Sequence, residues 1–332
     1  MKIVQVLATS GGMGGLEKHT LQLCNALSTQ HDVHLIADAS YQAQLNPSVQ
    51  LHAINFARSR WNPFLIYEII KKIKHIQPDI LHAQASKASS LLAPWLTQLP
   101  GKKVATIHGM KNKLTPFLAF DHIVAVSGKI AKKFPNDAKI KIIWNGVDQS
   151  ITANLQRSDL RHSLPIALAV GRLVEVKGFD VLVEAWQGLD AQLWIVGEGE
   201  QRPILESKTA GLGLQDKIKL LGYRDDVADL LQQVDCLIIS SRKEGGPITL
   251  AEALLNHVPV LATDVGMVAD FIDPRFICPE NDVNALKQLL STQLKLKAEM
   301  QPYFEHAFTQ AQQYLHFQAM LEQTENLYSS LL

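Results

Sequence analysis

Short apolar runs alternate with amphipathic stretches along most of this chain, and the alternation restricts the fold more than any other feature of the sequence. The run at 3–8 has the length and apolar content of a buried strand, whereas 65–76 carries its lysines on one face and is typical of a surface helix. Strands that alternate with helices at this spacing predict parallel β–α–β units. In the first half of the chain we expect strands at 3–8, 33–37, 79–83, 104–108, 122–127 and 141–145.

The same pattern begins again after residues 148–164, a polar segment without a clear period that is typical of an interdomain linker. A chain of 332 residues is long enough for two domains. We therefore predict an α/β fold with two Rossmann-like, doubly wound domains that face a cleft, at 1–150 and 164–308. In such sheets ligands bind at the carboxyl ends of the strands. The strands expected in the second half are 166–171, 192–197, 218–222, 236–241 and 259–264.

Charge is distributed unequally between the two halves, although the whole chain is formally neutral. Residues 1–150 hold 17 Lys and Arg against 8 Asp and Glu, whereas residues 151–332 hold 15 against 24. The imbalance could draw the two domains together, or it could give the first domain a basic face for an anionic membrane surface. The lysines of the first domain cluster at 71–74, 102–113 and 129–133.

Cysteine usage and hydropathy limit the cellular setting. Cys24, Cys236 and Cys278 are scattered, which argues against a disulfide framework or a structural zinc site and favours a reducing compartment. The first apolar run is too short for a signal peptide, and no run approaches the roughly 20 residues that cross a bilayer. We therefore expect a cytoplasmic protein, and we expect no nucleic acid among its partners.

A glycine-rich loop at 11–15 joins the first expected strand to the first helix. Gly14 and Gly15 would let the backbone come close to a ligand, and the helix start offers N–H donors to an anion. The loop also partly fits a dinucleotide-binding fingerprint, with Asp38 as the acid that binds ribose. Because Glu17 occupies the place of the third glycine, a dehydrogenase is the weaker alternative.

Two cations follow the strand expected at 166–171. Arg172 comes directly after this strand, and Lys177 lies just before the next helix. At the carboxyl end of a strand and beside a helix N-terminus, both could stabilise the charge of a diphosphate leaving group. The alternative is that both are solvated surface cations.

The segment EGGPITLAE at 244–252 places two carboxylates on either side of a bend in the backbone. A carboxylate can accept both hydroxyls of a cis-diol such as ribose. Glu244 and Glu252 could therefore hold the hydroxyls of a nucleotide-sugar, one at the ribose and the other at the transferred sugar. The alternative is a surface helix with spare charge.

The residues between these carboxylates fit a helix start that approaches a ligand. Gly245 and Gly246 would let the turn pass close to a sugar. We expect Pro247 at the first helical position, where a missing N–H costs nothing. The backbone amides of Ile248 and Thr249 would then face the phosphates.

Together, the motifs GGLEKHT, VGRLVEVKGFDVLVEAW and NGVD and the two glutamates of 244–252 resemble those of glycosyltransferases with the GT-B fold, and specifically the large retaining family GT4. The resemblance extends in the same order over nearly the whole chain. The tail at 314–328 is similar to the closing helices that cross back to the first domain in this family, so we assign 309–332 to such a helix. One departure is Gly246-Pro247, where many relatives have a bulky residue followed by glycine.

The resemblance implies a role for each matching position. Arg172 and Lys177 would bind the donor diphosphate, Glu252 the ribose and Glu244 the donor sugar, to which the family brings a histidine that corresponds to His108. His108, Arg172, Lys177 and Glu244 form the catalytic set that this implies, although a lone histidine at a strand end is often a packing or capping residue. The remaining matches are Gly14 and Gly15 near the phosphates or acceptor, Tyr223 and Arg224 beside the base through their backbone, Gly245, Gly246, Ile248 and Thr249 at the donor, and Ser127 and Asn145 elsewhere in the cleft.

These roles imply a retaining glycosyltransferase that moves a hexosyl unit from a nucleotide-diphosphate sugar, which we expect to be a UDP-sugar. The implied acceptor is a glycan or a lipid-linked molecule such as a lipopolysaccharide core, reached by a peripheral protein at the inner face of the membrane. No Asp-x-Asp motif flanks the cleft, so we expect no metal or other cofactor. Two alternatives stay open: a UDP-sugar epimerase of related fold, for which no acid–base set is evident, and a non-catalytic protein that binds nucleotide-sugars.

Overall fold

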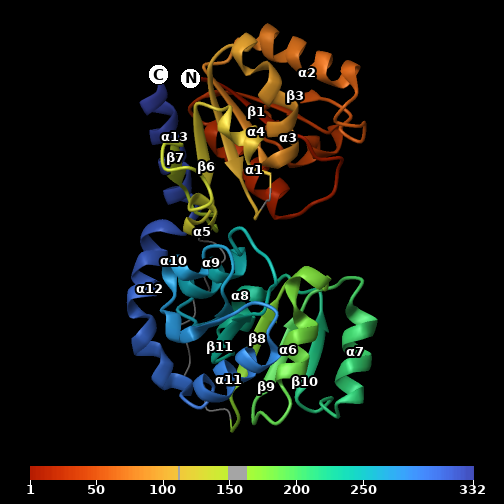
Figure 1. Cartoon of the computed structure of the whole chain (residues 1–332), viewed down its shortest axis with the longest axis vertical. Helices are drawn as coiled ribbons and strands as arrows, with labels where there is room; N and C mark the ends of the chain where they lie inside the picture. The colour runs from red at the N-terminus through yellow and green to blue at the C-terminus, as the bar shows by residue number, and fades with distance from the viewer. Residues whose placement is uncertain (111–112, 149–162) are drawn as a thin grey trace. The chain divides into compact units, whose positions relative to one another are not determined.

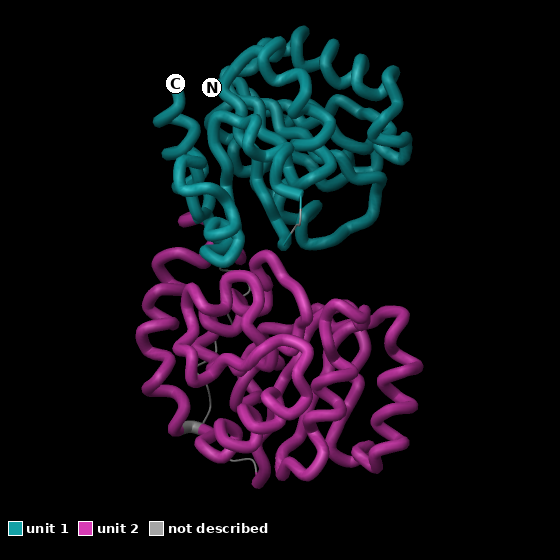
Figure 2. Tube along the Cα trace, in the orientation of Figure 1, with its two compact units in different colours: residues 1–144, 320–332 teal, residues 145–319 magenta. Residues whose placement is uncertain are grey.

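Parallel strands form two separate sheets in the computed structural model, which describes residues 1–110, 113–148 and 163–332 (Figure 1). The chain divides into two compact units (Figure 2). Unit 1 comprises Met1–Trp144 and Met320–Leu332, and unit 2 comprises Asn145–Ala319. The predicted linker at 148–164 falls almost entirely outside the described residues.

The sheet of unit 1 has seven parallel strands in the order β3-β2-β1-β4-β5-β6-β7. The chain winds outward from β1 in one direction and from β4 in the other, so the strand order reverses between these two neighbours. Ligands of such sheets bind at the carboxyl ends of the strands beside the reversal. The strands are β1 (Lys2–Leu7), β2 (Asp32–Ala37), β3 (Gln50–Ala53), β4 (Ile80–Gln84), β5 (Lys102–Ile107), β6 (His122–Ala125) and β7 (Ile140–Ile142).

Helices connect these strands and bury an apolar face. In α2 (Pro63–Ile76), Asn62 caps the first amides, and Leu65, Ile69 and Ile73 recur on the buried side. Each buried side chain of this size contributes about 1.5–3 kcal/mol. The other helices of unit 1 are α1 (Gly15–Leu27), η1 (Ala39–Gln44), α3 (Ala85–Leu92), η2 (Ala93–Gln98), α4 (Thr115–Leu118) and α5 (Gly128–Ala131).

The last helix, α13 (Phe317–Leu331), belongs to unit 1 from Met320 onward. Its Tyr328 is fully buried, and the hydroxyl lies 2.9 Å from Gln5 Nε2 and 2.5 Å from His82 Nδ1. Gln5 is on β1 and His82 is on β4, so the helix is tied to the two central strands. The chain thus returns to unit 1 at Met320, whereas residue 309, where the sequence placed this return, lies in a helix of unit 2.

The sheet of unit 2 has six parallel strands in the order β10-β9-β8-β11-β12-β13. Here the order reverses between β8 and β11, which are direct neighbours. The loops that follow these two strands therefore occupy the edge where doubly wound sheets bind ligands. The strands are β8 (Ile166–Val170), β9 (Gln192–Val196), β10 (Ile218–Gly222), β11 (Cys236–Ile239), β12 (Val260–Thr263) and β13 (Ile277–Cys278).

Trp186 anchors the core of unit 2 at the end of α6 (Phe179–Ala185). Its ring is fully buried, and its Nε1 donates a hydrogen bond to the Ala191 carbonyl at 3.1 Å, which satisfies its one polar atom. No helix in the described part of the chain is both long and apolar enough to cross a membrane. The other helices are η4 (Glu175–Lys177), α7 (Arg202–Gly211), α8 (Val227–Leu231), α9 (Ile248–Leu255), α10 (Val268–Phe271), η5 (Pro274–Phe276), α11 (Val283–Gln293), η6 (Lys297–Met300) and α12 (Gln301–Tyr314).

The predicted fold class, two doubly wound Rossmann-like domains, is confirmed, but the sequence misses two strands at sheet edges. All four residues of β3 are at least partly exposed, and β13 has only two residues. Edge strands this short lack the apolar run that marks a buried strand. Conversely, the strands predicted to end at 108, 127, 171 and 241 end earlier, because the chain leaves the sheet there and forms the loops described next.

Candidate functional site

Charged side chains gather at the carboxyl edge of the unit 2 sheet, where the strand order reverses. Lys177, after β8, and Glu244, after β11, form an ion pair with Nζ 2.5 Å from Oε1. Ser241 donates a hydrogen bond to the same carboxylate oxygen at 2.9 Å. The two charged side chains are only 24% and 16% exposed. The structure therefore joins two predicted site residues that lie 67 positions apart in the sequence.

Two glycines let the loops at this edge approach one another closely. Gly178 has a φ of 64°, and a Cβ there would lie 2.2 Å from the carbonyl oxygen of Ser240. Gly197, with a φ of 141°, would place a Cβ 1.9 Å from the carbonyl oxygen of Gly171. Only glycine fits at these two points. The loops that follow β8, β9 and β11 are therefore packed backbone against backbone beneath the ion pair.

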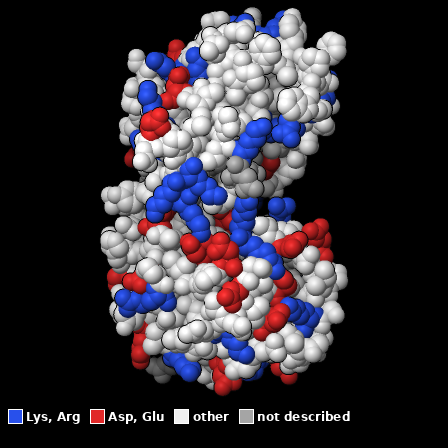
Figure 3. Space-filling model, in the orientation of Figure 1, with Lys and Arg blue, Asp and Glu red and all other residues white. Residues whose placement is uncertain are grey.

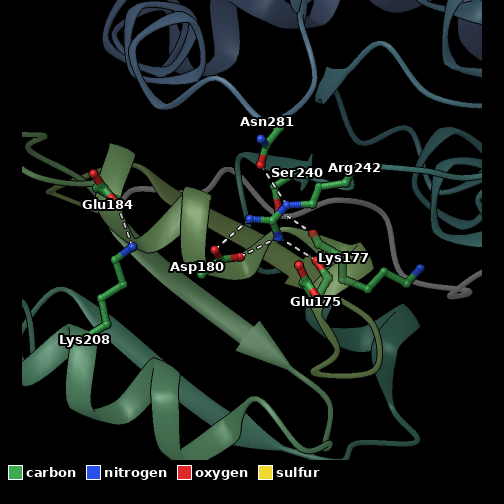
Figure 4. A network of polar contacts seen from close by, with 8 residues as sticks. All are labelled: Glu175, Lys177, Asp180, Glu184, Lys208, Ser240, Arg242 and Asn281. Atoms are coloured by element: carbon green, nitrogen blue, oxygen red, sulfur yellow. Dashed lines mark hydrogen bonds and ion pairs between the residues drawn. The ribbon is translucent and has the colours of Figure 1, made fainter.

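Arg242 holds the loops of this edge together, and no motif in the sequence indicates it. Its guanidinium donates to both carboxylate oxygens of Asp180 at 2.8 and 2.7 Å, and also to the Glu175 carbonyl and to Asn281 (Figure 4). The guanidinium lowers the pKa of the Asp180 carboxyl, and that carboxyl raises the pKa of Arg242. Arg242 thereby ties together the segments that follow β8 and β11 and the one that precedes α11.

The clamp also determines where Lys177 lies. Ser240, two residues before Arg242, donates to the Lys177 carbonyl at 3.0 Å. The Lys177 side chain extends away from Arg242, and its amine is left to pair with Glu244 (Figure 4). The partners of Arg242 come from distant segments, so no local pattern in the sequence could have identified it.

Helix α9 begins at Ile248, directly after the two glycines of the loop. The prediction that Pro247 is the first helical residue is wrong by one position, because its ψ of 117° is extended and it precedes the helix. Among the described residues no side chain caps the start of this helix, so no side chain satisfies the amides of Ile248 and Thr249. Glu252 is half-buried in the second turn of the same helix.

Asn145 supports the glycine turn before α9. Its Nδ2 donates to the carbonyl oxygen of Gly246 at 3.0 Å, while its Oδ1 is buried and has no hydrogen-bond partner among the described residues. A buried acceptor without a hydrogen bond destabilises the fold by about 1–3 kcal/mol, and a donor of a bound ligand could satisfy it. The residue predicted as a lesser cleft position therefore contacts the turn that carries the predicted donor-binding glycines.

Three further predicted residues follow the neighbouring strands of unit 2. Arg172 is exposed directly after β8. Tyr223 is 75% exposed after β10, and Arg224 makes a bidentate ion pair with Asp226. The Arg224 guanidinium is thus engaged, which is compatible with a contact to a base through its backbone. Within the described residues no cluster of three or more His, Cys, Asp or Glu side chains could hold a metal ion.

His108 lies directly after β5, at the carboxyl edge of the unit 1 sheet. Its Nε2 lies 2.7 Å from Gln84 Oε1, and its ring packs edge-on against His19 at 4.9 Å. Because an amide oxygen can only accept, Nε2 carries the proton and Nδ1 keeps its lone pair. Burial, together with the nearby rings of His19 and His82, holds the pKa of His108 well below its usual value. His108 is therefore neutral near pH 7.

A buried chain of hydrogen bonds continues from His108 across the sheet of unit 1. Gln84 Nε2 donates to Gln5 Oε1 at 2.9 Å, and Gln5 Nε2 donates to the Tyr328 hydroxyl. The hydroxyl can then donate to His82 Nδ1, and His82 Nε2 to Thr106 Oγ1 at 2.7 Å. Every donor points the same way, which requires a neutral His82; burial lowers its pKa to about 3. None of these supporting residues is among the predicted site residues.

The glycine loop of unit 1 joins β1 to α1. The left-handed residues are Gly11 and Gly12, with φ of 87° and 88°, whereas the Gly14 amide is occupied by Glu17 Oε2 at 3.1 Å. Gly15 is the exposed first residue of α1. Asp38, the acid required for a dinucleotide fingerprint, instead caps η1 by accepting from the Ser40 amide.

Ser127, the other lesser cleft position predicted in unit 1, is fully buried and caps a helix. Its hydroxyl accepts a hydrogen bond from the Ile130 amide at the start of α5. The side chain thus has a structural task that the motif alone does not reveal.

Two doubly wound parallel sheets, a helix that returns to the first unit and a charged edge on the second together define a class of protein. These are the features of GT-B glycosyltransferases, and the comparisons with known proteins agree. The family described as "Glycosyltransferase Family 4" matches residues 13–150, and "Glycosyl transferases group 1" matches residues 150–309. The two families together span residues 13–309, and the chain is a glycosyltransferase with the GT-B fold.

Individual relatives are distant but extend over most of the chain. The lipopolysaccharide core biosynthesis glycosyltransferase LpsE of Rhizobium meliloti is 26% identical over 266 residues, 76% of either chain. The N-acetyl-alpha-D-glucosaminyl L-malate synthase of Bacillus anthracis is 22% identical over about 90% of each. Among solved structures, Anabaena HepE in complex with UDP covers both chains fully with a TM-score of 0.83 at 19% identity. A Rickettsia africae glycosyltransferase has a TM-score of 0.82 at 24% identity and covers 99% of this chain and 98% of its own.

Proposed function

We propose that this glycosyltransferase uses a UDP-sugar as donor, retains the anomeric configuration, and glycosylates a glycan or lipid-linked acceptor of the lipopolysaccharide-core type. The observation that carries the proposal is the Lys177–Glu244 pair beside the uncapped start of α9, at the strand reversal of unit 2. HepE, of similar fold, binds UDP, and LpsE acts in lipopolysaccharide core biosynthesis, which supports the donor and acceptor classes.

Donor binding would exchange the partner of Lys177. Without ligand, the ammonium is neutralised by Glu244. A diphosphate carries more charge than one carboxylate and would draw the ammonium to itself, with Arg172 and the amides of Ile248 and Thr249 as further donors. Glu244, released from Lys177, is then free to accept hydroxyls of the transferred sugar. One movement therefore couples binding of the phosphates to recognition of the sugar.

We further propose that no metal takes part in the leaving-group step. Charge that develops on the departing diphosphate would be stabilised by Arg172, Lys177 and the α9 amides. Turnover should then be indifferent to EDTA. Strong inhibition that Mn²⁺ restores would refute this part of the proposal.

His108 would act as a neutral polar group. Its Nε2–H is committed to Gln84, so the Nδ1 lone pair is the side that could accept a hydroxyl of the donor sugar. Substitution by alanine should lower turnover with little loss of UDP affinity. Unchanged turnover would make His108 a structural residue.

Unit 1 carries a surface suited to the membrane interface, which we propose as its site of peripheral attachment. Trp61, Phe64 and Tyr67 are 82%, 77% and 64% exposed at the start of α2. Phe64 and Tyr67 share a helical face with Lys71 and Lys74. Aromatic side chains next to lysines are typical of helices that lie in an anionic interface. On the face in Figure 3, much of the surface of unit 1 is uncharged, and its cations gather in a few patches, some of them beside acidic side chains.

The predicted lysine cluster at 102–113 does not form one face. Lys102 and Lys103 begin β5, whereas Lys113 follows its opposite end, and Lys111 lies outside the described residues. Cosedimentation with vesicles should therefore depend on Phe64 and Tyr67. Their double substitution by serine should abolish binding to anionic vesicles, while Tyr303→Ser, at an exposed position of unit 2, should not. Equal binding by both variants would contradict the assignment.

The donor assignment is tested by calorimetry with UDP, GDP and ADP and their glucose derivatives. Glu252→Gln should weaken UDP binding by about 1.5–3 kcal/mol, because it loses charge-assisted bonds to ribose. Glu206→Gln, on the exposed face of α7, is the control. Donor binding without transfer to any acceptor would indicate a binding protein, and release of an altered free sugar would indicate an epimerase.

A further inference from the structure

Unit 1 has an open pocket of about 730 Å³ at its own strand reversal. The chain after β1 and the chain after β4 form two of its sides, and residues 58–61 form another. All of its lining residues belong to unit 1, so the pocket is complete within this unit. Residues 58–61 and 84–87 lie outside every motif that the sequence shows.

The charge of this pocket has one sign. Arg58, Arg60 and Lys87 line it, and no lining residue is Asp or Glu. Lys87 Nζ donates to the Phe56 carbonyl at 2.6 Å, and Arg58 reaches Glu68, outside the pocket lining, only at 3.4 Å. Among the described residues Arg60 has no carboxylate partner. Three cations around one cavity repel one another, and an anion in the cavity would relieve that repulsion.

Backbone and hydroxyl donors add to these cations. Helix α3 starts at the pocket without a side-chain cap, so its first amides are not satisfied by a side chain. Ser86 lies in its first turn, and its Oγ is buried without any hydrogen-bond partner among the described residues. Ala85, just before it, has a left-handed φ of 63°, a conformation that a non-glycine residue adopts at a cost. A buried hydroxyl without a partner indicates a ligand acceptor at this point.

We propose that this pocket binds an oxyanionic group, a phosphate or a carboxylate, carried by the acceptor sugar. The inference rests on the proposed function, because it assigns the acceptor of the same transfer reaction. The oxyanion lies between Arg60, Lys87 and the Ser86 hydroxyl at the start of α3. Trp61, exposed at the rim, offers a flat apolar face to the sugar ring. A neutral glycan would leave Arg60 and Lys87 without a carboxylate or phosphate partner.

The test measures binding of three sugars to the full chain in the absence of nucleotide. Glucose 6-phosphate and glucuronate carry the two oxyanions, and glucose is the neutral reference. At least one anionic sugar should bind about tenfold or more tightly than glucose, and the tighter of the two identifies the group. Arg60→Gln and Lys87→Gln should each remove most of this preference. Lys132→Gln, an exposed lysine outside the pocket, should leave it unchanged.

Two outcomes would overturn the inference. One is glucose that binds as tightly as both anionic sugars, and the other is retention of the wild-type preference by the Arg60 and Lys87 variants. Inorganic phosphate that binds as tightly as glucose 6-phosphate would show an anion site that takes no sugar, and this too would overturn the acceptor assignment. UDP binding, measured on the same samples, reports on unit 2. If the wild type binds UDP but does not prefer an anionic sugar over glucose, only this inference is refuted. If the wild type does not bind UDP, the proposed function itself is contradicted.

Discussion

Replacing Glu244 with glutamine should raise the affinity for UDP and lower the affinity for a UDP-sugar relative to that for UDP. In the ligand-free protein the Glu244 carboxylate holds Lys177 Nζ at 2.5 Å. A diphosphate must compete with this carboxylate for the ammonium. Glutamine keeps the shape and can still accept from Ser241, but its neutral amide oxygen competes less. UDP should therefore bind more tightly to the variant.

The size of the gain in UDP affinity depends on how strongly Lys177 and Glu244 attract each other in this partly buried place. Two unit charges 4 Å apart interact by about 4 kcal/mol at an effective dielectric constant of 20, and desolvation offsets much of this. A net 1–2 kcal/mol for the competition corresponds to roughly 5- to 30-fold tighter UDP binding. A UDP-sugar would also lose the bonds from its hydroxyls to the carboxylate, about 1.5–3 kcal/mol. The affinity ratio of UDP-sugar to UDP should thus fall at least tenfold.

Calorimetry with UDP and UDP-glucose on the full chain measures both quantities. Glu252→Gln is the informative comparison, because loss of a group that binds ribose should weaken the binding of UDP and of UDP-glucose by the same factor. Glu206→Gln controls for the loss of one surface carboxylate. UDP could bind the Glu244→Gln variant no more tightly than the wild type while the unfolding temperature is unchanged. The diphosphate would then not compete with Glu244 for Lys177, and the proposed change of partner of Lys177 would be refuted.

Three other perturbations test the supporting structure. Arg242→Gln should lower kcat by about tenfold or more and destabilise the protein by about 1–3 kcal/mol, since Asp180 loses its bidentate partner; Arg275→Gln, at an exposed pair, is the control in kinetics and urea unfolding. Tyr328→Phe should cost about 1–3 kcal/mol in urea unfolding, because the buried Gln5 amide and His82 lose their common partner, whereas Tyr67→Phe should cost almost nothing. The free energy of unfolding should also fall as the pH drops below about 6.5 toward 4. Burial lowers the pKa of His19 to about 4 and that of His82 to about 3, so in this range the unfolded chain binds protons that the folded chain does not. The expected loss is up to about 1.4 kcal/mol per pH unit for each of these histidines. A flat stability profile over this range, measured by urea titration, would contradict the buried neutral state of these rings.

The sequence predicts the fold well because the information for it is local. A run of five or six apolar residues has to be buried on both faces of a parallel sheet, and it indicates a strand wherever it occurs. This reasoning finds the central strands of both sheets. It fails at β3, where half-exposed residues pair only at the edge, and at β13, which has two residues.

The functional side chains are also partly local, because doubly wound sheets present their ligands to the residues just after the strands. Arg172 follows β8, and His108 follows β5. Position alone suggests them as site residues. It does not reveal their partners: the contact of His108 is an amide on β4, and that of Lys177 is a carboxylate after β11.

Polar residues inside strands show why the rest could not be predicted. Gln5, His82 and Gln84 interrupt apolar runs, and each alone suggests a weak point in a strand. In the structure their side chains form one chain of hydrogen bonds, together with the Tyr328 hydroxyl of α13. The cost of burying each group is met only by the others, so their meaning depends on strand neighbours that the linear sequence does not show.

The same reasoning applies to the carboxyl edge of the unit 2 sheet, where the motif residues alone do not determine the geometry of the site. Asp180 and Arg242 contribute no atom to the Lys177–Glu244 pair, yet they hold together the loops on which that pair is built. A chain can keep Arg172, Lys177 and both glutamates and still lose the clamp. Its ammonium and carboxylate would then sit on loops free to separate, and the exchange of Lys177 from carboxylate to diphosphate would lose its fixed geometry. If these residues bind the donor as proposed, donor binding would therefore depend on the Arg242–Asp180 pair as much as on the residues of the motif.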